Sequence, residues 1–196
     1  IMFIQTLTTS FGITNTLVKA VPLIFAGLAV YLPLKARLWN IGAEGQLIIG
    51  AIVGTTVGLT VSLPIYALLP LMFLTGGVAG AMWIVVPAWL RARDGINEII
   101  TTLLFVFIAQ SLLNYVVRGP LQAAESNFPQ SASLPTAATL PSLPIVGFPS
   151  GILLAIVLVA GTYMVINYTR LGYEITFMGA NDNAAEHAGM SKLKIY

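Results

Sequence analysis

The chain has very few of the residues on which metal sites, disulfides and most catalytic centres depend. It contains no cysteine and a single histidine, His187, in 196 residues. Disulfides and thiolate metal sites are therefore excluded, and a histidine-based metal site or catalytic triad is not expected. No GxxxxGK[ST] phosphate loop occurs, so the chain cannot bind ATP in that way. We expect no catalytic residue, no metal and no cofactor held by this chain itself.

Charged residues are also scarce. Only 8% of the residues are charged and 57% are hydrophobic, whereas about a quarter of the residues of an ordinary soluble domain are charged. So few charged side chains cannot cover the surface of a soluble protein of this length. The formal net charge of +2 is small, and we expect no nucleic-acid partner. The composition predicts an integral membrane protein.

Long apolar segments supply the predicted fold. A helix that crosses the hydrocarbon core needs roughly 20 mostly apolar residues. The predicted spans are residues 12–34, 45–62, 65–90, 96–117 and 151–168. The predicted fold class is all-α, a polytopic transmembrane helix bundle of about five spans that forms one domain over residues 1–196. Because the chain begins at Ile1 and stops within a polar segment, we interpret it as a fragment, with residues 1–11 ending a further span or lying at the interface.

The positions of lysine and arginine predict the orientation, because short loops rich in these residues stay in the cytoplasm. One side of the five-span arrangement collects Lys35, Arg37, Arg91, Arg93, Arg170, Lys192 and Lys194. The other side has Lys19 and Arg118. Residues 169–196 are therefore predicted to be cytoplasmic, and the proline-rich segment 118–149 is predicted to be an external irregular loop. This loop is either a lid or spacer packed over the bundle, or a contact for an external delivery protein.

Glycines at helical spacing occur in the second and third spans. They are Gly50, Gly54, Gly58, Gly76 and Gly80. Small residues four apart let helix backbones approach closely inside a membrane. We predict that these glycines pack the helices into a compact bundle.

Two polar segments interrupt the apolar runs. In LWNIGAEGQLIIG (38–50), either Asn40 caps a helix with Glu44 in its first turn, or Asn40, Glu44 and Gln46 line a water-filled pathway. In RARDGINEII (91–100), Asp94 is predicted as an N-cap, with Asn97 and Glu98 in the opening turn or along the same pathway. The two interpretations are compatible, because a pathway can be built on helix ends.

The last segment, residues 169–196, contains a predicted short helix over 181–188. Asn181 or Asp182 can cap it, and Gly189 can end it in the left-handed conformation. A helix this short is marginal alone in water. It must therefore dock against the bundle or against a partner.

Three stretches, in this order, resemble the permease subunits of ABC importers for nucleosides and simple sugars, in the branched-chain amino acid and ribose-type permease family. They are LWNIGAEGQLIIGA, GINEIITTLL followed by LLNYVVRGPL, and LGYEITFMGANDNAAEHAGMS. The resemblance runs from about Leu17 to the end of the chain. Five residues match the family's coupling pattern: Gly179, Asn181, Ala184, Ala185 and Gly189.

The resemblance implies a multi-pass permease of the plasma membrane that moves its substrate by alternating access. It implies a second permease copy or homologue, an extracytoplasmic substrate-binding lipoprotein, and two cytoplasmic ATPase subunits that bind ATP and Mg²⁺ and dock on helix 181–188. Family members continue with further spans, which agrees with the fragment interpretation. The NIGAEGQ form favours nucleosides over simple sugars as the first expected substrate. Three residues depart from the family pattern, namely Trp39 for Phe, Val106 for Asn and Thr176 for Arg.

Two other classes of function stay open at this point. One is an ion-coupled secondary transporter in which Glu44 or Glu98 carries a proton or sodium ion at a broken helix. The other is a structural or signalling membrane subunit. A docking helix beside a conventional bundle favours the ABC permease, and no inverted repeat that would favour the secondary transporter is visible in the sequence.

Overall fold

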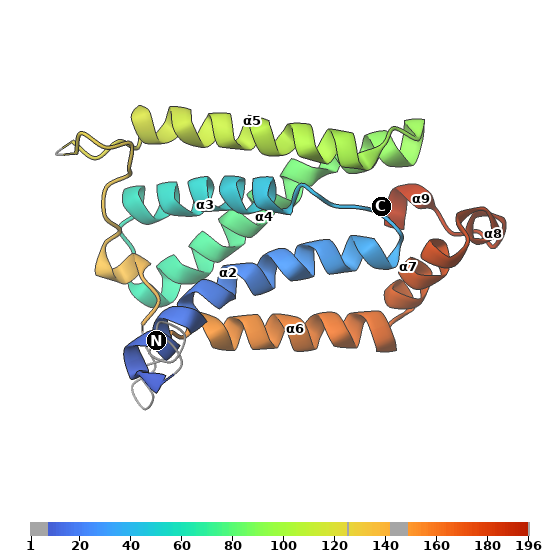
Figure 1. The fold of residues 1–196 in the computed structure, drawn as a ribbon, viewed down its shortest axis with the longest axis horizontal. Coiled ribbons are helices and arrows are strands. Elements are labelled where there is room, and N and C mark those ends of the chain that lie inside the picture. The colour runs from blue at the N-terminus through green and yellow to red at the C-terminus, as the bar shows by residue number, and fades with distance from the viewer. Residues whose placement is uncertain (1–7, 125, 142–148, 196) are drawn as a thin grey trace. The chain divides into compact units, whose positions relative to one another are not determined.

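The computed structural model describes residues 8–124, 126–141 and 149–195, and this part of the chain is built of helices (Figure 1). Its elements are α2 (Ser10–Lys35), α3 (Ala43–Thr60), α4 (Ile65–Asp94), α5 (Glu98–Arg118), the 3-10 helix η1 (Thr136–Ala138), α6 (Gly151–Tyr168), α7 (Arg170–Ala180), α8 (Asp182–His187) and α9 (Lys192–Ile195). Helices α2 to α6 are long and apolar enough to cross a membrane. The five predicted spans are confirmed, with ends that differ by at most four residues. The predicted interfacial or spanning piece at 1–11 lies mostly outside the described residues.

Polar side chains determine where several helices begin. Asn97 caps α5, because its side chain accepts a hydrogen bond from the Ile99 N–H at 2.9 Å. The prediction that Asp94 is the N-cap is wrong, since Asp94 is the last residue of α4. Gly95 follows it with φ of 67°, a left-handed conformation that ends α4 and delays the next helix until Asn97.

The chain divides into two compact units. The central unit comprises Trp39–Thr139, and the terminal unit comprises Ile1–Leu38 together with Leu140–Ile195.

In the central unit α3 lies against both α4 and α5 (Figure 1). A Cβ added at Gly76 of α4 would lie 2.8 Å from the Gly50 carbonyl oxygen of α3, and one at Gly80 would lie 2.9 Å from the Gln46 carbonyl oxygen. The pairing of 50 with 76 and 46 with 80 makes the two helices antiparallel. Their backbones approach so closely because glycine has no side chain at the contact.

Helix α5 packs against both α3 and α4 and runs parallel to α3. A Cβ added at Gly42 would lie 3.2 Å from Thr102 Cβ, and one at Gly45 would lie 3.3 Å from Val106 Cα. Val106, which replaces a polar residue of the family pattern, is buried in this contact. Trp83 of α4 completes the unit, since its indole N–H donates to the carbonyl of α5 residue 105 at 3.3 Å.

The loop after α5 has little regular structure in its described residues. An isolated antiparallel bridge joins Gln122 to Ser131, and η1 contacts α4. Ala138 is buried, and a Cβ added at Gly58 would lie 3.0 Å from a methyl carbon of Leu134. This part of the loop is therefore packed on the helices of the central unit.

In the terminal unit α2 and α6 lie side by side, and α7 to α9 follow the end of α6 (Figure 1). A Cβ added at Gly151, the first residue of α6, would lie 3.6 Å from Val21 of α2. Further along, Gly179 of α7 lies against the carbonyl of Lys35 at the end of α2, where a Cβ would collide with the oxygen. The contacts 21 with 151 and 35 with 179 place α2 and α6 parallel, with α7 across their ends.

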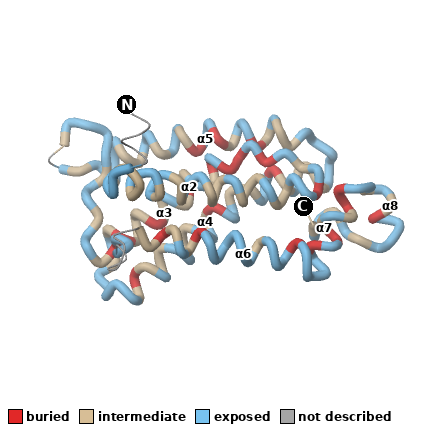
Figure 2. The backbone as a smooth tube through the Cα atoms, turned by 60° about the horizontal axis from the view of Figure 1, so that its bottom comes forward, coloured by how far each residue is buried: buried red, intermediate tan, exposed pale blue. Residues whose placement is uncertain are grey.

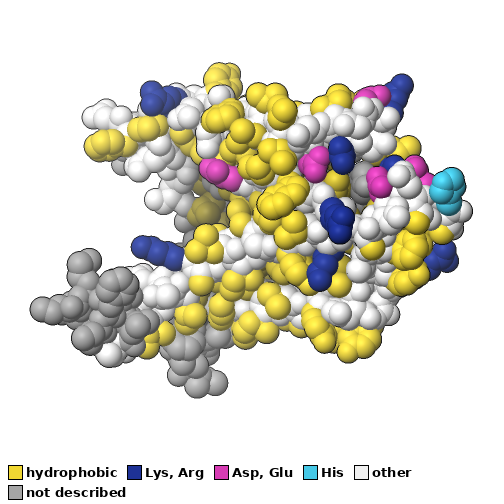
Figure 3. Space-filling model, turned by 45° about the vertical axis from the view of Figure 1, so that its right-hand side comes forward, with side chains coloured by type: hydrophobic (Ala, Val, Ile, Leu, Met, Phe, Trp, Pro, Cys, Tyr) yellow, Lys and Arg dark blue, Asp and Glu magenta, His cyan; other side chains and the backbone are white. Residues whose placement is uncertain are grey.

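Most apolar side chains of these helices are not covered by the chain itself (Figure 2). Helix α2 has no buried residue in its most apolar window, and only 6% of that of α4 is buried. The molecular surface accordingly shows hydrophobic side chains over large areas (Figure 3). Exposed apolar area on this scale requires lipid or other protein chains to cover it.

Candidate functional site

The polar segment before α3 is held by hydrogen bonds within the central unit. Asn40 is buried, and its side-chain NH₂ donates to Gln46 Oε1 at 2.9 Å. Gln46 Nε2 in turn donates to the Gly80 carbonyl of α4 at 3.4 Å. The prediction that Asn40 caps α3 is wrong, because Gly42 occupies the N-cap position without a side-chain bond. Asn40 bonds to a side chain of the following helix instead of its backbone.

Glu98 is likewise engaged inside the central unit. Its carboxylate accepts the backbone N–H of Trp39 at 3.2 Å and lies 3.3 Å from Arg91 Nε. The Glu98 side chain is only 13% exposed. Together with the capping role of Asn97, these bonds join the start of α5, the end of α4 and the segment that leads into α3.

The neighbours of this segment show that α3 begins beyond the start of α5. Trp39 lies level with Glu98, and Gly42 lies level with Thr102, one turn further along α5. One turn is about 5 Å of helix rise. Non-helical backbone at membrane depth is tolerated where protein buries it or where it borders a cavity, and Asn40, Gly42 and Ala43 are buried here.

Glu44 differs from the other polar residues of this region. It is exposed, and its carboxylate accepts a hydrogen bond at 3.0 Å from the side chain of Gln110 on α5. Gln110 lies twelve residues after the start of α5, about 18 Å along a helix that rises 1.5 Å per residue. The Glu44–Gln110 pair therefore lies near the middle of α5, a helix of 21 residues that is long enough to cross a hydrocarbon core of roughly 30 Å.

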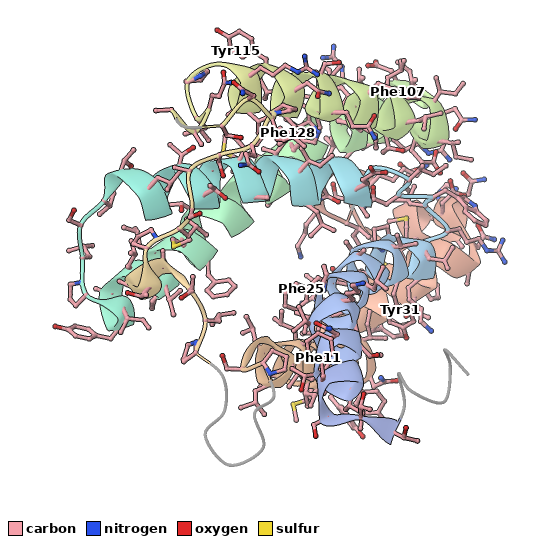
Figure 4. The ribbon with its side chains drawn as sticks, turned by 60° about the vertical axis from the view of Figure 1, so that its left-hand side comes forward. Phe11, Phe25, Tyr31, Phe107, Tyr115 and Phe128 are labelled. Atoms are coloured by element: carbon pink, nitrogen blue, oxygen red, sulfur yellow. The ribbon has the colours of Figure 1, made fainter. Side chains whose placement is uncertain are left out.

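Sequence reasoning did not select Gln110, although a signal was present. Gln110 and Asn114 stand four apart in an otherwise apolar span, which puts them on one helix face. Asn114 donates to the Gln110 carbonyl at 2.9 Å, within α5. On the same helix, Phe107 and Tyr115 also project from the surface (Figure 4).

The structure thus separates the five residues predicted to line a pathway. Asn40, Gln46, Asn97 and Glu98 are used in bonds that hold the central unit together. Glu44 alone among them presents an exposed polar group at mid-span. Ionisable groups at this depth are costly against lipid, by about 2.5–3.5 kcal/mol for a charged side chain on insertion scales. The exposed face of Glu44 and Gln110 is therefore better suited to water, solute or protein than to lipid.

The second candidate region is the segment α7–α9 of the terminal unit. The predicted short helix is present as α8, capped by Asn181, whose side chain accepts the Ala184 N–H at 3.0 Å. Gly189 ends it with φ of 84°. Ala185 points inward and is fully buried, whereas Ala184 is partly exposed. The five residues that match the coupling pattern thus serve capping, close packing and termination of this segment.

Helix α7 was not predicted as a separate helix. Thr169 caps α7 by accepting a hydrogen bond from the Gly172 N–H at 3.2 Å, and Met178, on the inner face of α7, is buried. A cap at Thr169 followed by apolar residues at 171, 175 and 178 is the helical signal that sequence reasoning overlooked.

A buried carboxylate fastens α9 to α7. Glu174 is 6% exposed, and its two oxygens bind Arg170 Nε at 2.8 Å and Lys194 Nζ at 3.4 Å. The hydrogen bond from Arg170, with the positive charge of Lys194, holds the pKa of Glu174 below its ordinary value of 4.5, although burial acts in the opposite direction. Glu174 is therefore ionised at neutral pH. Within the described residues no group of three or more His, Cys, Asp or Glu side chains is arranged to hold a metal ion.

Comparison with known proteins places these features in a family. Residues 12–196 match the family described as branched-chain amino acid transport system / permease component. The chain is 56% identical over 207 aligned residues to the glucose ABC transporter permease protein TsgB13 of Haloferax volcanii, covering all of this chain and 54% of the relative. It is 32% identical to the guanosine ABC transporter permease protein NupP of Bacillus subtilis, covering 92% of this chain and 53% of the relative.

A third relative is the nucleoside ABC transporter permease protein NupB of Lactococcus lactis, 28% identical over 97% of this chain and 55% of the relative. The chain spans about half the length of the curated relatives it matches. No solved structure matches it. With five apolar helices of spanning length and a family match over nearly the whole chain, it is a multi-pass membrane protein, and it belongs to the branched-chain amino acid transport system / permease component family.

Proposed function

We propose that the chain is the membrane-spanning part of the permease subunit of an ABC importer. The structural observation that carries the proposal is the segment α7–α9, which follows the apolar helix α6 and contains a short helix with a cap at Asn181 and a left-handed end at Gly189. Asn183 and His187 of this short, internally braced helix are exposed, which leaves them accessible to a partner chain. In the proposed transporter α8 is the contact for a cytoplasmic ATPase subunit.

The proposed substrate is a simple sugar of the hexose class. The relative with 56% identity is named for glucose, whereas the relatives named for guanosine and nucleosides are 32% and 28% identical. This similarity favours a sugar over the nucleoside suggested first by the NIGAEGQ motif. A hexose and a nucleoside share a ring bearing several hydroxyls, which carboxylate and amide groups bind by accepting and donating hydrogen bonds.

In this proposal the substrate passes the Glu44–Gln110 pair. The pair combines a carboxylate acceptor with an amide that still has a second N–H, and at mid-span Glu44 is exposed and Gln110 is partly exposed. Asn40, Gln46 and Glu98, which are buried or partly buried, act one layer behind, and together with the cap residue Asn97 they fix the start of α3 and α5. This arrangement resembles small-molecule sites in which a few polar groups stand on rigid helices.

The driving force in this proposal comes from partner chains. Two ATPase subunits bind ATP and Mg²⁺, and their closure moves α8, and α7 with it, between inward-facing and outward-facing states. A second permease copy or homologue covers part of the exposed apolar surface, and lipid covers the rest. An extracytoplasmic binding protein, expected to be a lipoprotein, delivers the sugar to the face that carries the loop after α5.

Uptake by the assembled transporter in proteoliposomes tests the proposal. Labelled glucose is expected to accumulate only with ATP and the ATPase subunits. Unlabelled guanosine is expected to compete only weakly with the uptake of labelled glucose. The test variant is Glu44→Gln, which keeps the size of the side chain and removes its charge. The control variant is Asn114→Ala, which lies one helical turn beyond Gln110 on α5. Glu44→Gln is expected to reduce the rate at least about tenfold, as for the loss of a charge-assisted hydrogen bond of 1.5–3 kcal/mol, while Asn114→Ala changes it less.

Three results would count against this function. Uptake that persists without ATP but is abolished by an uncoupler indicates an ion-coupled secondary transporter instead. Preferential transport of guanosine overturns the sugar assignment while leaving the transporter class intact. Wild-type uptake by Glu44→Gln, with normal insertion in the membrane, removes the Glu44–Gln110 pair from the pathway.

A further inference from the structure

The two lysines of α9 bind back onto the helices before it. Lys192 Nζ lies 3.1 Å from Glu186 Oε2 and 3.4 Å from Asp182 Oδ2, so that one ammonium group bridges both acidic residues of α8. Lys194 reaches Glu174 of α7 at 3.4 Å. In this way a four-residue helix connects α7 and α8 through charge. Figure 3 shows acidic and basic side chains close together at the surface of this C-terminal segment.

Helix α8 needs such support because it is short. Its six residues form fewer than two turns, and isolated helices below about 12 residues are marginal in water. Its other attachments are the buried Ala185 and a backbone bond at 3.0 Å from the Met190 N–H to the Ala185 carbonyl. These hold one face and one end of the helix. The acidic face, formed by Asp182 and Glu186 four residues apart, is held by Lys192.

The environment of Lys192 agrees with a bridging role. Its side chain is only 23% exposed, whereas Asp182 and Glu186 are about half exposed. The hydrogen bond and charge of Glu186, followed by those of Asp182, raise the pKa of Lys192 above its ordinary value of 10.5. The lysine is therefore charged at every physiological pH, and its bridge does not switch off within that range.

The bridge also determines which part of α8 is left for a partner. Ala185 faces inward and the Asp182–Glu186 face is occupied by Lys192. Asn183 and His187, again four residues apart, are exposed on the remaining face. The remaining face that α8 presents outward is therefore polar.

We propose that Lys192 is a positioning residue, whose bridge to Asp182 and Glu186 holds α8 rigidly on α7 so that the Asn183–His187 face engages the ATPase. This inference rests on the proposed function, because it concerns how α8 transmits motion. Rigidity matters because, if α8 moves freely relative to α7, a displacement imposed on α8 by the ATPase changes only the position of α8 and is not passed on to α7. The ion pair of Glu174 with Lys194 is the second anchor, because it holds α9, which carries Lys192, on α7.

Spin-label mobility at Asn183 in the assembled transporter tests the rigidity. These 196 residues contain no cysteine, so Asn183→Cys introduces a single label within them, and any cysteine elsewhere in the subunit is replaced by serine. Lys192→Met is expected to raise the mobile fraction of this label about three- to fivefold, as for the loss of a weak surface ion-pair network. Lys192→Arg is expected to restore most of the order, and so is the reversed pair Lys192→Glu with Glu186→Lys. A mobile fraction that Lys192→Met leaves unchanged overturns the proposal.

The ratio of sugar transported to ATP hydrolysed tests the positioning role. Lys192→Met is expected to lower this ratio by about the same three- to fivefold factor, with recovery in Lys192→Arg. A ratio that stays at the wild-type value while the label becomes mobile overturns the positioning role. A failure of the proposed function is distinguishable, because it appears in the unmodified protein as uptake without ATP dependence, whereas label mobility requires no transport.

Discussion

The close backbone contact between α3 and α4 at Gly50 and Gly76 supplies a sharp test of how the helices of the central unit pack. Replacing Gly76 by alanine adds one methyl group to α4, at the point where it crosses α3. That Cβ would lie 2.8 Å from the Gly50 carbonyl oxygen, about 0.6 Å short of the ordinary contact range that begins at 3.4 Å. The obstructing atom belongs to the backbone, so it cannot turn aside as a flexible side chain does. The two helices must separate or shift along each other.

The expected cost follows from that separation. A gap of roughly 0.5–1 Å forfeits a quarter to a half of the dispersion attraction of the atoms that border it. Overpacking of this kind costs typically about 1–3 kcal/mol. Gly77→Ala is the matched control, because the same substitution one residue along the same helix meets no atom within 4 Å. By removing a glycine from a helix interior it is expected to be neutral or to stabilise by roughly 0.5–1 kcal/mol.

Thermal denaturation of the purified protein in detergent, followed by the fraction that stays monodisperse, measures the difference. For a chain of this length each kcal/mol corresponds to about 2–4 °C in Tm. Gly76→Ala is expected to melt several degrees below the wild type, and Gly77→Ala at or above it. Equal melting temperatures for the two variants would show that α3 and α4 do not make the close backbone contact described here.

Two further predictions concern the terminal unit. Because the pKa of Glu174 is lowered in the folded protein, the stabilisation by this group is complete above pH 4.5 and is lost as the pH falls through the lowered pKa. A spin label at Leu193→Cys is therefore expected to become mobile upon such acidification, and in the Glu174→Gln variant the same label is expected to be mobile already at pH 7. Equal label mobility at pH 7 with and without Glu174→Gln contradicts the anchoring role. Gly179→Ala would place a Cβ against the Lys35 carbonyl, so it is expected to lower Tm by at least about 2–4 °C. The control is Gly161→Ala on α6, where the added Cβ meets nothing within 4 Å, and this variant is expected to leave Tm unchanged.

The sequence predicted the helical spans well because membrane insertion depends on a property that is local in the chain. A run of about 20 apolar residues is readable without knowledge of its neighbours, and α6 begins and ends where it was predicted. Helix ends near Gly95 were less predictable. Asp94 and Asn97 are both good capping residues, and the left-handed glycine between them decides that the first ends a helix and the second begins one.

The candidate site was less predictable, because the sequence shows which polar residues are present but not which of them bind each other. That Asn40 and Gln46 line a pathway stays a prediction, and the sequence did not show that their side chains form a hydrogen bond with each other. Glu98 was expected there too, and it holds Arg91 and the Trp39 N–H. The residue that pairs with Glu44 lies 66 positions away, on a helix whose rotation the sequence does not specify. Tertiary pairing therefore decides which polar groups stay exposed.

The lengths of the helices explain why this pairing occurs at mid-depth rather than at the interface. Helix α4 has 30 residues and α3 only 18, and their antiparallel contact at Gly80 and Gln46 leaves the last turns of α4 extending beyond the start of α3. The chain fills that length with residues 39–42, which run beside the first turn of α5. Glu44 then enters α3 about two turns beyond Glu98, since the next residue, Gly45, lies level with Val106 of α5. If α3 began level with the end of α4, as in a regular helix hairpin, the Glu44 carboxylate would lie near the lipid headgroups. The non-helical residues 39–42 instead carry it towards the middle of the membrane, where a carboxylate most needs a polar partner.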